Sequence, residues 1–256
     1  REDFAISAPD MVLAGASGVT ERIKLGTAVT VLSSDDPIRV MERFNTLDAM
    51  SNGRAEITVG RGSFIESFPL FGFDLNDYEV LFEEKFDMFA QLLDAPRRFN
   101  WSGTHRSPVV DGVIQPRAER RIGAWVGVGG SPESVIRAVR HKVPMMLAII
   151  GGEARRFLPY VQLYRDAQAE VGMDPMPLGV HSPGLIAGSD DEARDRVRDA
   201  WIDSRNRIGR ERGWPPSGVG EFEREVEQGS FYVGSAETVA QRIAETVLLL
   251  GLDRFD

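Results

Sequence analysis

The chain has 256 residues, of which 42% are hydrophobic and 27% charged, a composition typical of a soluble globular protein with one large domain or two small ones. It has no cysteine, which excludes disulfide bonds, thiolate metal ligands and cysteine nucleophiles, and its net charge of −9 argues against a general nucleic-acid binder. The histidines His105, His141 and His181 lie far apart without metal-binding spacing, so we expect no metal site.

The longest apolar run, residues 143–150, is far shorter than the roughly 20 residues that a membrane-spanning helix needs. The chain begins at Arg1, and no basic segment followed by an apolar one opens it, so a secretory signal is not indicated. We therefore expect no membrane partner and a cytoplasmic protein that binds small molecules or a second copy of itself.

In the first half of the chain, short apolar runs alternate with helical patterns. An apolar strand is expected over residues 23–32, and residues 36–37 (Asp-Pro) then begin a helix that ends near Gly53. A second strand follows over residues 55–59. After a loop rich in Phe and Gly, apolar residues at intervals of three and four predict a long helix over residues 78–93.

The second half continues the alternation. Four further strands are expected, each followed by a helical pattern: residues 123–128, 144–150, 178–187 with a break at Pro183, and 231–233. Residues 203–229 are charged and punctuated by Gly and Pro, so they interrupt the pattern, and we expect an insertion or a lid over a site.

Six strands that alternate with helices are typical of repeated βα units around a parallel sheet. Two architectures fit: an open doubly wound sheet, or a (β/α)8 TIM barrel that lacks two of its strands. No internal repeat and no shift in composition marks a boundary, so we expect one domain over residues 1–256. Strand counting alone leaves both architectures open.

Three of the expected strands end in glycine-rich turns, Gly60-Arg61-Gly62, Gly129-Gly130-Ser131 and Gly151-Gly152. Ligands of α/β folds bind at the carboxyl ends of strands, glycine lets a phosphate approach the main chain, and a helix start favours an anion. Ser131 and Ser134 would add hydroxyl groups and Arg61 a forked cation. Together these turns predict a phosphate pocket.

Each piece of this pocket also has a simpler interpretation. Ser131 is of the type that caps an ordinary helix, and Arg61 is equally consistent with a salt-bridging loop residue. Neither a GxGxxG nor a GxxxxGK[ST] motif occurs at these turns, so no nucleotide-binding motif supports a Rossmann or P-loop fold.

Two other features could contribute to chemistry. His181 lies in the middle of an apolar strand, where a hydrogen-bonded core histidine is the commoner case; it is also our candidate catalytic residue. The aromatic loop with Phe64, Phe68, Phe71 and Phe73 is typical of a core, although a flat ring system would suit it.

Several of these segments resemble the bacterial luciferase-like flavin monooxygenases. The resemblance rests on RIKLGTAV (residues 22–29), DPIR (36–39), TLDAMSNGR (46–54), VGRG (59–62) and FG (71–72), which match in order and spacing. Residues 126–132 (VGVGGSP) and 233–239 (VGSAETV) resemble later strand ends of the family with less specificity. The resemblance thus covers most of the chain.

The resemblance implies a (β/α)8 barrel that binds FMN, usually reduced by a separate flavin reductase, and uses O2 to oxidise a small organic substrate; homodimers are expected. Other relatives use the deazaflavin F420 as a hydride carrier. By the same resemblance, Arg61 holds the flavin phosphate and Gly60 lies beside the flavin's reactive carbon.

The remaining cofactor-binding candidates come from the same comparison and from the turns. Ser131 and Ser134 match the polar helix-start residues that complete the phosphate site, and the glycines Gly129, Gly130 and Gly151 stand at strand ends. Ala28 and Val29 match a strand bulge where the family often has a non-prolyl cis peptide bond.

The sequence departs from the family at its front, because the first two strands of the family and a histidine-bearing segment precede anything aligned with Arg1. We therefore expect a natural chain that extends upstream, and downstream of Asp256 with a final helix. A complete chain of this length would instead favour a non-catalytic flavin-binding protein.

Our leading hypothesis is an FMN-dependent monooxygenase, and its nearest rival is an F420-dependent oxidoreductase. An unrelated barrel acting on phosphosugars would need a lysine or carboxylate base at a strand end, but Lys24, Lys85 and Lys142 fall at strand starts or on helices. The substrate is not indicated by the sequence.

Overall fold

The computed structural model describes residues 6–62 and 65–256, so Phe64 of the expected aromatic loop lies outside the described residues. The chain divides into two compact units. The first consists of Arg1–Gly127 and Arg140–Pro144, and the second of Val128–Val139 and Met145–Asp256.

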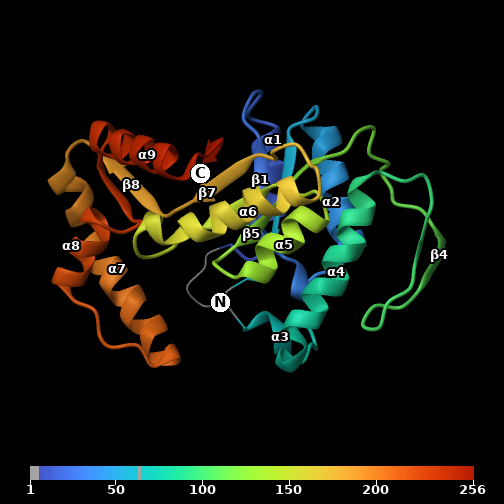
Figure 1. Ribbon diagram of the computed structural model, residues 1–256, viewed down its shortest axis with the longest axis horizontal. Coiled ribbons are helices and arrows are strands. Elements are labelled where there is room, and N and C mark those ends of the chain that lie inside the picture. The colour runs from blue at the N-terminus through green and yellow to red at the C-terminus, as the bar shows by residue number, and fades with distance from the viewer. Residues whose placement is uncertain (1–5, 63–64) are drawn as a thin grey trace. The chain divides into compact units, whose positions relative to one another are not determined.

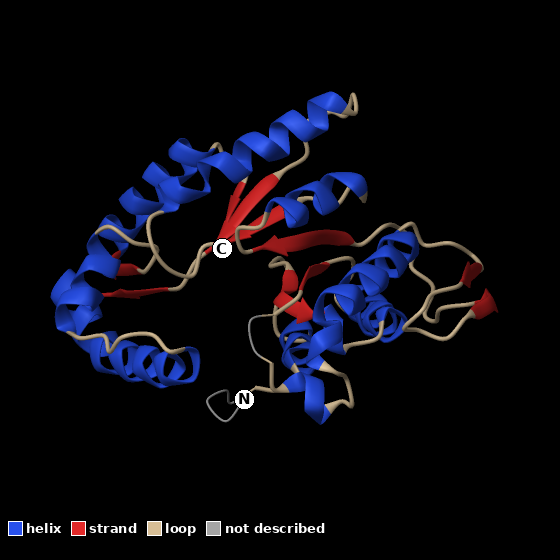
Figure 2. Ribbon diagram, turned by 60° about the horizontal axis from the view of Figure 1, so that its bottom comes forward, coloured by secondary structure: helices blue, strands red, loops and turns tan. Residues whose placement is uncertain are grey.

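Three parallel strands form the sheet of the first unit, in the order β1 (Leu25–Val31), β2 (Ala55–Gly60) and β5 (Gly123–Val128). The apolar side chains of β2 and β5 are buried, as the near-continuous apolar runs predict for strands covered on both faces. In β1, Leu25 is buried, whereas Val29 and Val31 are partly exposed. The helices α1 (Pro9–Ser17), α2 (Pro37–Met50) and α4 (Tyr78–Leu93) gather to one side of these strands in Figure 2.

Helix α2 begins where the sequence predicts. Asp36 accepts hydrogen bonds from the backbone N–H groups of Ile38, at 2.9 Å, and Arg39, and Pro37 occupies the first turn. Between β1 and α2 lies a short 3-10 helix, η1 (Leu32–Ser34), and the carbonyl of Ser33 in it accepts a hydrogen bond from α4. The cap therefore fixes the residue at which α2 begins after β1 and η1.

The core of the first unit is aromatic. Phe44 from α2 and Phe82, Phe86 and Phe89 from α4 are almost fully buried, and the rings of Phe82 and Phe86 stack with centroids 5.6 Å apart. Burial of such a side chain contributes about 1.5–3 kcal/mol, so the stripe of apolar residues at helical spacing accounts for much of the packing of α4. Figure 1 shows α2 and α4 side by side.

The buried guanidinium of Arg54 ties the turn after α1 to the start of β2. It donates hydrogen bonds to four carbonyl groups and one hydroxyl: the backbone oxygens of Ser17, Thr20, Ile23 and Ser51, and the Thr20 Oγ1. Since carbonyls at a helix end have no partner within the helix, this single side chain satisfies groups that would otherwise be buried without hydrogen bonds.

Beyond α4, an antiparallel hairpin of β3 (Phe99–Trp101) and β4 (Val109–Gly112) extends away from the helices, an element the sequence analysis did not include. Glu84 holds its turn by accepting hydrogen bonds from the backbone N–H groups of Thr104, His105 and Arg106. Burial opposes the charge on Glu84, but these three donors hold its pKa below the usual value. Two short helical turns, α3 (Ser67–Leu70) and η2 (Leu75–Asp77), precede α4.

The second unit contains a parallel set of three strands, β6 (Met145–Ala148), β7 (Leu178–His181) and β10 (Arg254–Phe255). The connection from β6 to β7 contains η3 (Ala154–Phe157) and α6 (Leu158–Glu170). Tyr164 of α6 is buried; its hydroxyl accepts from the backbone N–H of Met145 and donates to the carbonyl of Pro177, both at 3.2 Å. Burial raises the pKa of Tyr164 to about 12.

A separate parallel pair, β8 (Gly184–Ala187) and β9 (Tyr232–Ser235), is connected through α7 (Asp190–Arg212) and α8 (Val219–Glu227). Phe222 and Phe231 pack with Trp201 around the core of this layer. At one end Asp190 accepts from the backbone N–H of Ser235 and from the Thr238 hydroxyl, and these hydrogen bonds lower its pKa. Helix α9 (Ala236–Leu250) follows β9.

The structure confirms the α/β class and the parallel strands, whereas closure into an eight-stranded barrel stays a prediction. The strand expected over residues 178–187 divides at Pro183 into β7 and β8, which belong to different sheets. The strand expected at residues 231–233 pairs with β8, and the short β10 lies beside β7 instead. Proline lacks the N–H that a central ladder requires, which explains the division.

The segment 203–229, expected as an insertion or lid, consists of the second half of α7, a connection and α8. Helix α7 continues to Arg212 and ends at Gly213, which adopts the left-handed conformation. Gly209 and Trp214 then turn the chain, and Arg205 lies 4.6 Å from the Trp214 ring centroid. Its role as a cover over a site stays a prediction.

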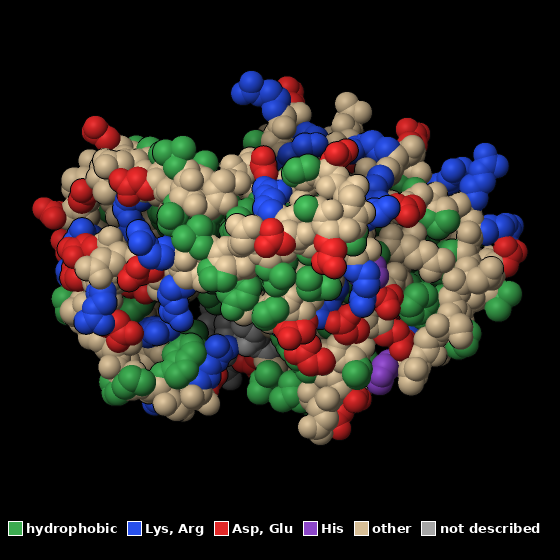
Figure 3. Space-filling view, in the orientation of Figure 1, with side chains coloured by type: hydrophobic (Ala, Val, Ile, Leu, Met, Phe, Trp, Pro, Cys, Tyr) green, Lys and Arg blue, Asp and Glu red, His purple; other side chains and the backbone are tan. Residues whose placement is uncertain are grey.

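Basic and acidic side chains lie next to one another over the face shown in Figure 3. Ion pairs at the surface of the protein include those of Arg140 with Glu83 and Asp87, and of Arg194 with Glu223. Exposed pairs of this kind contribute about 0–1 kcal/mol each. Within residues 6–62 and 65–256, no helix is long and apolar enough to cross a membrane.

Candidate functional site

The carboxyl end of β1 departs from regular strand geometry. The peptide bond between Ala28 and Val29 is cis, and the register against β2 shifts between Ala28 and Thr30. The hydroxyls of Thr27 and Thr30 lie 2.8 Å apart on either side of this bond. The bulge and the cis bond that the resemblance implies at Ala28 and Val29 are therefore confirmed.

Val29 lies against the backbone of the next two strands, where glycines leave room for it. A Cβ atom added to Gly60 of β2 would stand 2.8 Å from Val29 Cγ2, and one added to Gly127 of β5 would stand 3.1 Å from Val29 Cγ1. Because real Cβ atoms do not approach a neighbour as closely as 2.8 Å, Gly60 cannot carry a side chain without movement of Val29. The three residues together form an apolar floor at the strand ends.

Arg61 follows Gly60 at the end of β2. Its guanidinium forms an ion pair with Glu79 of α4 and lies 5.7 Å from the ring centroid of Tyr78. The Tyr78 hydroxyl donates a 2.6 Å hydrogen bond to the carbonyl of Gly62, and burial is the main cause of its raised pKa. The start of α4 thus orients the Arg61 side chain, of which 26% is exposed. The forked cation remains accessible to a ligand.

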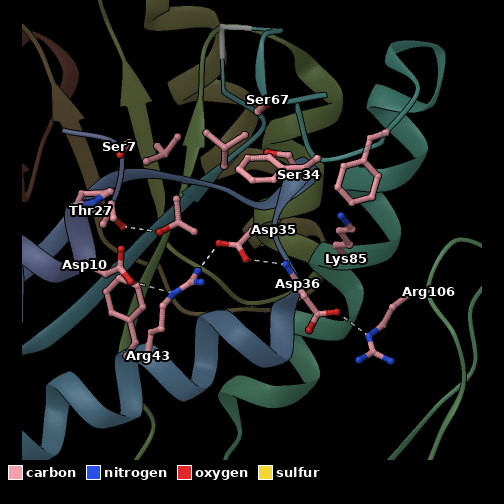
Figure 4. Close-up of a pocket in the computed structure, with 18 of the residues that line it drawn as sticks. Ser7, Asp10, Thr27, Ser34, Asp35, Asp36, Arg43, Ser67, Lys85 and Arg106 are labelled. Carbon is pink, nitrogen blue, oxygen red and sulfur yellow. Dashed lines mark hydrogen bonds and ion pairs between the residues drawn. The ribbon is translucent and has the colours of Figure 1, made fainter. Parts of the chain in front are cut away.

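A cavity of about 870 Å³ begins at Val29 and extends between β1, η1, α2 and α4 (Figure 4). This volume lies within the range of about 300–1,000 Å³ occupied by small-molecule sites. Phe44, Phe71 and Phe73 supply aromatic walls, and the described turn of the β3–β4 hairpin contributes Arg106. The cavity therefore combines apolar surface with a few polar groups.

Most charges in this cavity are paired. Arg43 contacts Asp10 at 3.3 Å and also pairs with Asp35, and Arg106 Nε lies 3.0 Å from Asp36. Figure 4 shows Arg43 directed from α2 toward both of its partners. Such pairs hold the cavity walls in place, because each side chain has a fixed partner.

In the second unit, the start of α5 (Pro132–Arg140) carries the expected hydroxyl groups. Ser131 accepts a hydrogen bond from the backbone N–H of Ser134 at 3.3 Å, which is the bond of an ordinary N-cap, and its hydroxyl lies 2.8 Å from that of Ser134. Buried Arg137 donates to the Ser134 hydroxyl at 3.1 Å. The positive side chain of Arg137 therefore lies about one turn after the start of α5. The sequence analysis did not include it among the phosphate-pocket residues.

The glycines of the second unit differ in how much space surrounds them. No heavy atom lies within 4 Å of a Cβ added to Gly129 or to Gly151, so their backbones are open to a ligand. Gly130 has a φ of 108°, which favours glycine, and faces the ring of Tyr160. Next to Gly151, the N–H of Gly152 donates to Glu225 at 2.9 Å. A carboxylate of the protein thus already occupies that backbone donor.

His181 lies at the end of β7 and is half-buried. Its Nδ1 is buried and has no hydrogen-bond partner among the described residues, so this nitrogen lacks the bond expected of a core histidine. Burial lowers the pKa of the imidazole, and Asp256 opposes that shift. A neutral imidazole with an unused nitrogen can accept a proton, and a catalytic role for His181 stays a prediction.

The structure places the predicted site residues in two groups. Ala28, Val29, Gly60 and Arg61 meet at the strand ends of the first unit, whereas Gly129, Gly130, Ser131, Ser134, Gly151 and His181 belong to the second. Sequence reasoning did not identify the cavity, although Asp36, which it placed at the start of a helix, is one of the residues that line it. Among the residues that the structure describes, no group of His, Asp and Glu side chains could hold a metal ion.

Curated monooxygenases have sequences similar to this chain. It is 27% identical over 204 residues to the alkanal monooxygenase alpha chain of the Kryptophanaron alfredi symbiont, which covers 77% of this chain and 56% of that protein. It is 29% identical over 227 residues to 4-hydroxyprotoasukamycin monooxygenase of Streptomyces nodosus subsp. asukaensis, with 82% and 59% covered. The chain spans about half the length of the first curated relatives it matches (56%, 45% and 46%).

Solved structures share the fold at low sequence identity. Monooxygenase RslO1 from Streptomyces bottropensis superimposes with a TM-score of 0.82 at 22% identity, covering 97% of this chain and 74% of that one. The oxygenating constituent of 3,6-diketocamphane monooxygenase from Pseudomonas putida, in complex with FMN, gives 0.74 at 16%, with 98% and 78% covered. An F420-dependent secondary alcohol dehydrogenase gives 0.76 at 16%, with 99% and 79% covered.

The family model for luciferase-like monooxygenases matches residues 2–254. This range covers nearly all of both units and every strand from β1 to β9, and it ends within β10. The expected resemblance is confirmed, and the chain belongs to the luciferase-like monooxygenase family.

Proposed function

We propose that this chain is the flavin-binding part of a monooxygenase that uses reduced FMN and O2 to oxidise a small organic substrate. The observation that carries the proposal is the end of β2. There the Val29 side chain lies against Gly60, which has no side chain of its own, and the accessible cation of Arg61 follows. A flat apolar floor next to a forked cation fits a ring system that carries a phosphate. Reduced FMN would supply the electrons for activation of O2.

Within the first unit, the roles of the residues follow from their contacts. Val29 would support the face of the ring system, and Gly60 would keep the end of β2 free of a side chain that would displace Val29. Arg61 would bind phosphate oxygens while Glu79 keeps its guanidinium in place. In the second unit, Ser131 and Ser134 would donate to an anion from the start of α5, and Gly129, Gly130 and Gly151 would allow close approach of its oxygens.

The same residues would also suit F420, which carries a phosphate as well. This alternative is favoured by the similarity to an F420-dependent secondary alcohol dehydrogenase, whose TM-score against this chain is 0.76. A non-catalytic flavin-binding protein is the third candidate. The leading proposal also includes a separate flavin reductase as partner, a homodimer and a cytoplasmic location. It assigns His181 as the catalytic residue.

The test compares FMN with riboflavin, which lacks the phosphate, in binding titrations of the parent chain and of Arg61→Ala. A charge-assisted hydrogen bond contributes about 1.5–3 kcal/mol, so the variant should lose roughly 10- to 150-fold in FMN affinity while riboflavin binds as before. Reduced FMN and F420 are titrated in parallel to decide between the cofactors. Arg39→Ala, an exposed arginine on α2, is the matched control.

Two further variants separate the contributions. Arg61→Lys keeps the charge without the fork and should recover only part of the affinity. Ser131→Ala tests, independently of Arg61, whether the start of α5 contributes to FMN affinity. An unchanged ratio of FMN to riboflavin affinity in Arg61→Ala would remove the phosphate-binding role, and a preference for F420 would replace the monooxygenase by a hydride-transfer enzyme.

A further inference from the structure

Lys85 is a cation of the first-unit cavity, and the proposed function gives it no role. It is a residue of α4 and lines the cavity shown in Figure 4, yet only 5% of it is exposed. Lysine is almost never buried to this extent unless a partner neutralises it. The groups around its amine therefore decide whether its charge is neutralised within the chain.

The immediate partners of the amine are polar but uncharged. Nζ donates a 2.6 Å hydrogen bond to the carbonyl of Ser33 and lies 4.1 Å from the centroid of the Phe73 ring. An ammonium group has three N–H donors, of which the Ser33 carbonyl accepts one and the face of Phe73 attracts another. One donor is left for the cavity.

Lys85 has no direct ion pair in the cavity, although Asp36 and Asp35 favour its charge from a longer distance. Asp10, Asp35 and Asp36 are already paired with Arg43 and Arg106. Among the described residues, no carboxylate comes within 4.0 Å of Nζ, whereas both arginines have such partners. A ligand with a negative group could therefore form a direct ion pair with Nζ that the described residues do not form.

The rest of the cavity indicates the chemistry of that ligand. Phe71, Phe73 and Phe44 line it, and Val29 and Val31 add aliphatic surface. Phe71 is 62% exposed and lines the cavity, so its ring offers apolar surface to a ligand. Aromatic walls next to one buried amine suit a flat apolar body that carries a single carboxylate.

We propose that this cavity binds an aromatic carboxylate, whose carboxylate group forms an ion pair with Lys85 Nζ while its ring packs against Phe71 and Phe73. The cavity shares Val29 with the proposed flavin site, but the inference stands apart from the proposed function because the binding uses no cofactor and no turnover. Lys85 is thus assigned as the residue that selects an acidic ligand over a neutral one of the same shape.

The pH dependence of this binding follows from the position of the amine. Burial lowers the pKa of Lys85 to about 8, and Asp36, Asp35 and Glu84 oppose that shift. A carboxylate in contact with Nζ would raise the pKa again. Affinity should therefore be constant near neutral pH and fall about tenfold per pH unit once the amine loses its proton.

The other charged groups around the cavity do not produce this profile. From η1 and α2 these are Asp35, Asp36 and Arg43, from α4 Glu84, and from the hairpin turn His105 and Arg106. In general, carboxylates and guanidinium groups keep their charge between pH 7 and pH 10, and a histidine titrates below this window.

The first experiment titrates the full chain, without flavin, with 2-naphthoate and with the neutral 2-naphthamide by calorimetry. The parent should bind the carboxylate at least tenfold more tightly than the amide. Lys85→Met should lose this preference, and Lys142→Met, which changes an exposed lysine of the same unit, should keep it. Equal binding of the two probes by the parent, or competition by inorganic phosphate as strong as by naphthoate, would overturn the proposal.

A second measurement does not depend on the folding of Lys85→Met. The chain has only three lysines, Lys24, Lys85 and Lys142, all in the first unit, so 13C-labelled lysine gives three side-chain signals that can be assigned by substitution. The Lys85 signal should titrate well below the other two, and naphthoate should move its midpoint to higher pH. Binding that leaves the Lys85 midpoint unchanged would refute the ion pair.

Discussion

Replacement of Gly60 by alanine tests the contact on which the candidate site rests. The added Cβ would stand 2.8 Å and 3.1 Å from the two γ-methyl groups of Val29, and Val29 cannot retreat freely because it also lies against Gly127. The methyl group must therefore displace either a side chain or the strand end. We expect Gly60→Ala to destabilise the first unit.

The size of the effect can be estimated from the geometry. Overpacking of a well-packed site costs about 1–3 kcal/mol. Removal of the two Val29 methyl groups in Val29→Ala makes room for the new Cβ, at a cost of about 1 kcal/mol for lost burial. In the double variant the two changes should compensate one another, with a coupling energy of about 1–2 kcal/mol.

The assay is urea unfolding with a signal confined to the first unit. Trp101 and Trp125 lie in that unit and Trp201 and Trp214 in the other, so a parent in which the latter two are phenylalanine reports on the first alone. Gly15→Ala is the matched control, because a Cβ there meets no atom within 4 Å and alanine favours its helix.

Two results would refute the reasoning. One is a Gly60→Ala variant as stable as its parent, which would mean that Val29 moves without cost. The other is a double variant whose loss of stability equals the sum of the single losses, which would place the strain away from Val29. The control should be neutral or up to about 1 kcal/mol more stable.

Two further predictions concern charged groups that hold loops. Arg54→Met leaves buried carbonyl groups without donors and should lower the free energy of unfolding by at least about 3 kcal/mol in urea titrations; Arg54→Lys should not restore it, because an ammonium lacks the fork. Asp190 has a pKa lowered by the Ser235 N–H and the Thr238 hydroxyl, so its contribution to stability is present above the ordinary carboxyl pKa and is lost as pH falls through the lowered value. The melting temperature of Asp190→Asn should therefore lie below that of its parent at pH 7. The difference between the two melting temperatures should narrow as the pH approaches 3, and an equal difference at both pH values would contradict this.

Much of the fold could be predicted from hydrophobic patterning and local turn signals. The strand at β2, the cap at Asp36 and the aromatic stripe of α4 each depend on residues close in sequence, so their positions were predicted within a few residues. The pairing of β8 with β9 was not predicted, because the two strands are separated by α7 and α8 and no local signal specifies which strands meet. The β3–β4 hairpin was missed because its strands are short and lack an alternating pattern.

The candidate site was predictable where glycine marks it and not where distant side chains build it. Gly60 and Arg61 stand out in the sequence because a strand ends there. The cover that Val29 forms over two strands depends on how β1, β2 and β5 align, which no spacing reveals. The burial of Lys85 likewise results from a helix packing against the turn after β1, and on the sequence it resembles any lysine on a polar helix face.

The distribution of lysines has a practical consequence for attachment chemistry. Lys24 and Lys142 are exposed and stand just before β1 and β6, whereas Lys85 is buried. Amine-reactive dyes, cross-linkers and sensor surfaces will therefore couple through these two positions and the chain terminus, and will leave the second unit unlabelled. Since Lys24 precedes β1, immobilisation through it would leave the carboxyl end of that strand, with Val29 and Gly60 beside it, free for ligand in surface-based binding assays.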